Sequence, residues 1–100
     1  MKIKRYQAFN VLSALNLVEL KGLPAESKIC LVKNVSTLTT FCKESEGLRD
    51  GLKGDETAIT TLFNEEVEIE ILKLSEEDKK VLIENFAGPL GALSLILETL

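Results

Sequence analysis

The sequence predicts a mainly α fold with a minor β-ribbon: an αα-hairpin with short helices and one or two short strands, in a single domain over residues 1–100. Three observations predict it. Apolar residues recur with helical spacing through most of the chain. Gly22 and Pro24 form a hinge between two long helical stretches. One stretch, EVEIEI at residues 66–71, alternates charged and apolar residues, which is the period of a half-buried strand.

The composition is that of one globular domain, with 45% hydrophobic and 28% charged residues. The net charge of −4 hides an asymmetry, because residues 1–53 carry a balance of +4 and residues 54–100 a balance of −8. The acidic half disfavours nucleic acid as a partner, since phosphate binding needs clustered Lys and Arg. The asymmetry favours self-complementarity, within the chain or between copies.

Two long helices are predicted in the first half. Residues 5–20 have polar side chains at every third position, so no face is fully polar and we expect a helix buried along its length. The second helix runs from about Pro24 to about Asp50. Its apolar stripe has 4-3-4 spacing at Leu31, Val35, Leu38 and Cys42. The two helices form the αα-hairpin.

The second half is predicted to be shorter elements. Asp55 is the expected N-cap of a helix that ends near Asn64. Ser75, with Asp78 three residues later, resembles a capping box for a helix that ends near Phe86. Gly88 and Pro89 then break the chain before a last helix over residues 90–100.

The strand, predicted over Val67–Leu72, needs a partner for its backbone groups. Self-pairing between two copies would bring glutamate against glutamate. The N-terminal MKIK has the matching alternation: Met1 and Ile3 fit beside apolar residues, and the lysines meet glutamates. We therefore predict a ribbon, within one chain or across subunits, that brings together Lys2, Lys4, Glu66, Glu68 and Glu70. The alternative is an extended loop without a partner.

The residues that would carry catalysis are missing from the sequence. There is no histidine, hence no Ser-His or Cys-His pair, and no phosphate-binding glycine loop. Cys30 and Cys42 fall on one helix about 18 Å apart, which predicts free, buried thiols in a reducing compartment. Nine acidic residues lie between Asp55 and Asp78, but a strand row of glutamates splays rather than converges. We expect no catalytic residue, no cofactor and no metal site.

The C-terminal helix is predicted to serve self-association. Five residues cover one core-facing arc of about 120°: Leu90, Leu93, Ile96, Leu97 and Leu100. Leu95 lies off that arc with Ala92 nearby, so we expect these two residues to contact another subunit or a partner.

Two stretches, ALNLVELKGLPAESKICLVKNVSTL and LFNEEVEIEILKL, resemble a family of small uncharacterised proteins encoded by tailed bacteriophages. The distinctive motif is NEEVEI at residues 64–69. The chain departs from the family pattern in two places. Its long helix is rich in threonine where the relatives are densely charged, and its C-terminal stretch FAGPLGALSLIL is apolar. The resemblance implies a phage origin.

Two functions remain open from the sequence. The first is a virion structural or assembly component that self-associates. The second is an anti-defence or host-takeover protein that binds a host protein or sequesters a small signalling nucleotide. Lys2, Arg5 and Tyr6 are the one cluster suited to a nucleotide, and the same residues also fit a plain helix start. No apolar run reaches the roughly 17–25 residues of a membrane span. We expect the protein in the cytoplasm of a bacterial host or in the virion.

Overall fold

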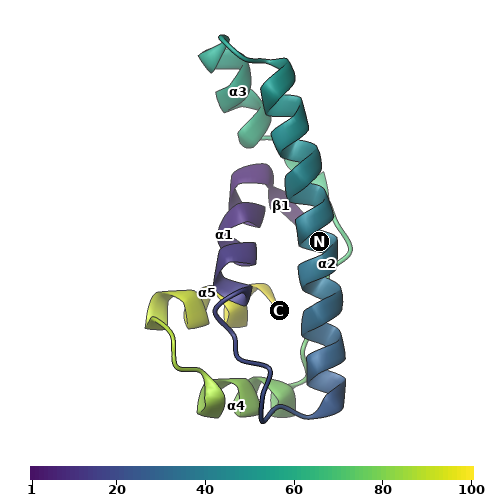
Figure 1. Cartoon of the computed structure of the whole chain (residues 1–100), viewed down its shortest axis with the longest axis vertical. Helices are drawn as coiled ribbons and strands as arrows, with labels where there is room; N and C mark the ends of the chain where they lie inside the picture. Colours follow the sequence, from purple (N-terminus) through teal and green to yellow (C-terminus); the bar gives the residue numbers. More distant parts are fainter.

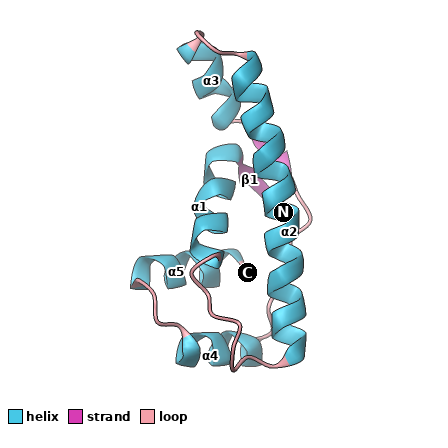
Figure 2. Ribbon diagram, in the orientation of Figure 1, coloured by secondary structure: helices cyan, strands magenta, loops and turns pink.

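The computed structural model describes residues 1–100 and contains five helices and a two-stranded antiparallel sheet (Figures 1 and 2). The fold class predicted from the sequence is confirmed. No helix is both long enough and apolar enough to cross a membrane. In chain order the elements are β1 (Lys2–Lys4), α1 (Arg5–Leu15), α2 (Ala25–Gly51), α3 (Glu56–Phe63), β2 (Glu66–Glu68), α4 (Glu76–Asn85) and α5 (Leu90–Thr99).

Helix α2 is the axis of an elongated molecule that measures 45 × 23 × 20 Å. Its 27 residues span about 40 Å at 1.5 Å per residue. Figure 1 shows α1 beside the middle of α2, and α3 folded back along the final turns of α2. Helix α4 lies near the beginning of α2, and α5 lies beside the end of α1. The radius of gyration is 14.8 Å, above the roughly 13 Å expected for a compact domain of this length.

The core follows the predicted apolar stripe of α2. Leu31, Leu38 and Cys42 are buried, and Val35 is half-buried against them. Side chains from α1, β1, α4 and α5 complete the cluster, as does the segment that follows β2. The buried apolar residues are Ile3, Ala8, Val11, Ala14, Leu15, Leu23, Leu31, Leu38, Phe41, Cys42, Ile69, Leu74, Leu82, Ile96 and Leu100.

Three buried polar residues on the same side of α2 attach other parts of the chain to it. Ser27 donates its hydroxyl to the Asp78 carboxylate at 2.5 Å and so holds α4. Asn34 binds the backbone of the segment after β2. Ser45 accepts a hydrogen bond from Arg5 at 3.0 Å and so holds the start of α1. Buried polar groups are tolerated when they are hydrogen-bonded, so these residues add positional specificity to an otherwise apolar face.

The predicted helix caps are largely confirmed. Asp55 accepts a hydrogen bond from the Ala58 amide at 3.0 Å, and Ser75 accepts one from the Asp78 amide at 3.1 Å. Pro24 takes the N-cap position of α2. Only half of the capping box at Ser75 forms, because the Asp78 carboxylate is engaged with Ser27.

Helix α1 ends at Leu15, so the prediction that it reaches Leu20 is wrong. The chain tightens into turns, with amide-to-carbonyl bonds from Leu17 to Ala14 and from Val18 to Leu15, each at 3.1 Å. Five more helical residues would carry the chain about 7.5 Å along the α1 axis. Instead the chain turns back towards α2, and Gly22 adopts a φ of +91°, which a side chain would strain.

The ribbon pairs as predicted and forms within one chain. Its register places Ile3 opposite Val67, flanked by the pairs Lys2–Glu68 and Lys4–Glu66. It is shorter than the predicted Val67–Leu72, because β1 is only three residues long and supplies no further partner. Beyond β2 the Ile69 amide binds the Met1 carbonyl at 2.9 Å, and the Leu74 amide binds the Leu100 carbonyl at 3.1 Å. The predicted strand therefore continues as an extended segment with other partners.

The predicted core-facing arc of α5 holds except at its first residue. Ile96 and Leu100 are buried, and Leu93 and Leu97 are half-buried against the core. Leu90 is 79% exposed, so its assignment to the core is wrong. Leu90 is the first residue of α5 and directly follows the N-cap Pro89. Figure 1 shows that this end of α5 projects away from α2.

Candidate functional site

Four of the predicted interface residues are engaged in the ribbon. Lys2 lies opposite Glu68, and Lys4 lies opposite Glu66. The close ion pair to Glu68 comes from the Met1 ammonium group, at 2.6 Å. This hydrogen bond is the main cause of a lowered pKa at Glu68, and the charge of Lys2 adds to it. These side chains therefore stabilise the fold of the single chain.

The remaining predicted interface residues lie apart from one another. Glu70 is exposed on the segment after β2 and borders a shallow hollow with Lys33. Leu95 and Ala92 are half-buried against the core, although the sequence placed Leu95 off the core-facing arc of its helix. Leu95 also lines a second hollow with Lys2 between α1 and α5. Contact of Leu95 with another subunit stays a prediction.

The acidic residues between Asp55 and Asp78 are spread over α3, β2 and α4. No group of three or more carboxylate or thiol side chains is arranged to hold a metal ion. The acidic half of the chain is a dispersed charge on the surface rather than a convergent site.

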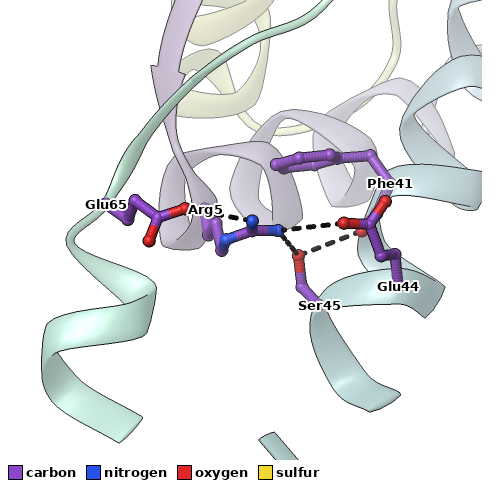
Figure 3. Close-up of polar contacts among 5 residues, drawn as sticks. All are labelled: Arg5, Phe41, Glu44, Ser45 and Glu65. Carbon is purple, nitrogen blue, oxygen red and sulfur yellow. Dashed lines mark hydrogen bonds and ion pairs between the residues drawn. The ribbon is translucent and has the colours of Figure 1, made fainter. Parts of the chain in front are cut away.

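Arg5 is buried, with only 6% of its surface exposed, and two of its guanidinium nitrogens are paired within the chain (Figure 3). Nη1 donates to Ser45 at 3.0 Å and lies 3.8 Å from Glu44. Nη2 donates to Glu65 at 3.2 Å, and the guanidinium carbon lies 5.1 Å from the centre of the Phe41 ring.

From the sequence, Lys2, Arg5 and Tyr6 form a cluster suited to binding a nucleotide. Lys2 and Tyr6 are exposed and line the same hollow between α1 and α5, while Arg5 points inward to α2. The three groups do not converge on a common point, and Arg5 joins β1 and α1 to α2 and to the residue before β2.

Both thiols are free, as predicted, with Cys42 buried and Cys30 half-buried. Burial is the main cause that raises the pKa of each thiol, and nearby Asp78 and Glu46 add to the effect at Cys30 and Cys42 respectively. The thiolate is the reactive form, so these environments disfavour nucleophilic chemistry.

The most apolar concave surface lies between the α1–α2 connection and α2, and we call it the hairpin groove. It is open to solvent, with a volume of about 210 Å³. Its lining residues are all apolar except Asn16: Leu15, Asn16, Val18, Leu20, Leu31, Val32 and Val35. Apolar grooves with few polar groups are the usual form of binding surfaces.

Sequence reasoning missed the hairpin groove because it placed Val18 and Leu20 in a buried helix. Since α1 ends at Leu15, these side chains lie in the connection and border α2 instead. The available signal was the apolar NLVEL immediately before the hinge, which supplies more apolar side chains than a helix end can bury.

Comparison of the chain with protein-family models, curated proteins and solved structures gives no match.

Proposed function

We propose that this protein is a non-catalytic binding protein of phage origin, and that it acts as a structural or assembly component of the virion through self-association. The observation that carries the proposal is the hairpin groove, whose open surface is apolar on both walls. An exposed apolar groove costs solvation free energy until a partner covers it, which is typical of an association surface.

The chemistry of the remaining side chains supports a binding role. Charged residues that could have formed a polar site are used in the fold, as with Arg5 and the Met1–Glu68 ion pair. The sequence has no histidine, and burial raises the pKa of both thiols. Apolar contact is the interaction for which this surface is best built.

The phage origin is supported by the NEEVEI motif at residues 64–69. These residues are part of the fold, because the Glu65 carboxylate accepts a hydrogen bond from Arg5 and residues 66–68 form β2. A motif that fixes both the ribbon and the Arg5 contacts preserves the fold that presents the groove.

Two measurements test the proposal. Light scattering after size-exclusion chromatography, over a concentration series, should give a mass of at least two 11.0 kDa chains. Mass spectrometry of purified particles of the encoding phage should then detect the chain. A single-chain mass at every concentration together with absence from particles would refute it. A stable complex with a host protein instead would favour the anti-defence function.

A further inference from the structure

Helix α2 has an uncovered face directly opposite its core side. At 100° per residue, five side chains fall within one arc of about 80°. We call them the outer stripe of α2: Ala25, Ile29, Val32, Ser36 and Thr40. All five are exposed, with Ile29 and Val32 at 55% and 52%. Figure 1 shows the other helices gathered on the opposite side of α2.

The outer stripe carries no charge over about 22 Å of helix. Charged side chains begin at its edges, with Lys28 on one side and Lys33 on the other. A solvated helix face of this length ordinarily carries charged residues. The chain has ample charge elsewhere, with 28% charged residues, so the absence is local to this face.

Further apolar side chains border the outer stripe. Val32 is shared with the hairpin groove, which brings Leu20 to one side. On the other side Ser36 borders exposed Leu72 in a hollow that also holds Lys33 and Glu70, so the apolar surface ends there. The stripe thus extends a wider apolar surface made by α2 and the α1–α2 connection.

The accessible surface of the chain is larger than expected for a compact monomer of its mass. The chain has an accessible surface of 6280 Å², whereas about 5600 Å² is expected for a monomer of 11.0 kDa. The excess, roughly 700 Å², is close to the ~800 Å² that each partner buries in a standard interface.

We propose that a second copy of this chain covers the outer stripe, with the two α2 helices crossing about a two-fold axis near Val32 and Ser36. Such an interface brings the same patch of both copies together, so each residue near the axis meets itself or its neighbours. An uncharged stripe does this without like-charge repulsion. A partner of different sequence would instead be expected to exploit the strong charges of the two halves of the chain.

This inference rests on the self-association in the proposed function and specifies its geometry. The test uses two variants of one residue, Val32→Glu and Val32→Lys. Each places like charges together at the axis, so each alone should have the mass of one chain by light scattering. Mixed in equal amounts, the two variants should regain the two-chain mass, because opposite charges then meet at the same position. Circular dichroism should show the helical signal of wild type in both.

Ile83→Glu on α4 is the matched control, since Ile83 is 49% exposed and undergoes the same change. It should keep the wild-type mass. Ser36→Glu and Ser36→Lys repeat the test at an exposed residue of the stripe that does not line the hairpin groove, as Val32 does. The Ser36 pair also replaces the Val32 pair if a Val32 variant loses its helical signal.

The outcomes separate the two proposals. Charged variants that keep the wild-type mass overturn the outer stripe as the interface and leave self-association standing. A mixture that stays at the single-chain mass overturns the two-fold arrangement. A single-chain wild type overturns both this inference and the self-association on which it rests.

Discussion

Asn34 and Leu72 are joined by two hydrogen bonds that copy the pairing of a β-ladder. The Asn34 amide group donates to the Leu72 carbonyl at 2.9 Å, and the Leu72 amide donates to the Asn34 oxygen at 2.8 Å. A side chain of α2 therefore supplies the partner that the extended segment after β2 lacks. Asn34 is buried and Leu72 is 45% exposed, so the contact is shielded from water on the side of α2.

Asn34→Ala should lower the free energy of unfolding by about 2–3 kcal/mol, since both Leu72 backbone groups lose their partner. The melting temperature should fall by roughly 10–20 °C for a domain of this size. Thermal and urea unfolding followed by circular dichroism measure both. Asn10→Ala, at an exposed site on α1, is the control and should change stability by less than about 0.5 kcal/mol. Equal effects of the two substitutions would contradict the role of Asn34.

Arg5→Lys should destabilise the protein by about 1–2 kcal/mol although it conserves charge. Lysine lacks the planar fork that reaches Ser45 and Glu65 at once. A double-mutant cycle with Ser45→Ala should give a coupling of about 1 kcal/mol. Arg49→Lys, at an exposed arginine of α2, should be neutral. A cycle without coupling would show that the contact between Arg5 and Ser45 contributes nothing to stability.

The ribbon register predicts a charge-reversal cycle. Lys4→Glu and Glu66→Lys should each cost roughly 0.5–1 kcal/mol, because like charges then lie directly opposite. The double variant should recover most of the loss, as measured by chemical unfolding. Combining Lys4→Glu with Glu70→Lys should recover little, because Glu70 lies outside the ladder. Equal recovery in both combinations would mean that only net charge matters.

Stability should fall in acid partly through Glu68. The Met1 ammonium lowers the pKa of this carboxyl in the folded state, so its contribution is present above the unfolded pKa and is lost as pH falls through the folded pKa. Between pH 6 and pH 3, wild type should therefore lose more stability than Glu68→Gln. Glu19→Gln, in the exposed α1–α2 connection, should follow wild type. Parallel curves for wild type and Glu68→Gln would contradict the linkage.

The two thiols should react slowly with iodoacetamide at neutral pH. Burial raises the pKa of both, which keeps them in the unreactive thiol form. Cys30 should be labelled before Cys42, because Cys30 is half-buried and Cys42 is buried. Mass spectrometry over time in native buffer and in urea measures this order. Labelling of Cys42 first, or at the unfolded rate, would show that α2 opens readily.

The ribbon and several helix starts could be predicted from the sequence. Pro24, Asp55 and Ser75 fix helix starts through backbone chemistry within a few residues. The pairing of β1 with β2 spans the chain, yet matched alternation of charge and apolar residues on both stretches identified it.

Burial of Arg5 could not be predicted, because its partners Ser45 and Glu65 lie 40 and 60 residues away and carry no pattern that identifies them. The end of α1 at Leu15 was missed for a different reason. Apolar residues continue past it, and only the path of the chain back to α2 shows that they form a groove wall. The prediction that Leu90 lies in the core was wrong, because a helical wheel shows only the direction of a side chain around the axis and not whether that end of the helix reaches the core.

The pairing of β1 with β2 can form only after β2 has been synthesised. Residues 2–4 are made well before their partners at residues 66–68. Until then Ile3 has no opposite strand and Arg5 has no Glu65. Closing such a long loop costs more conformational entropy than forming a helix turn. The residues of β1 thus leave the ribosome well before β2 and are among the last to reach their final contacts.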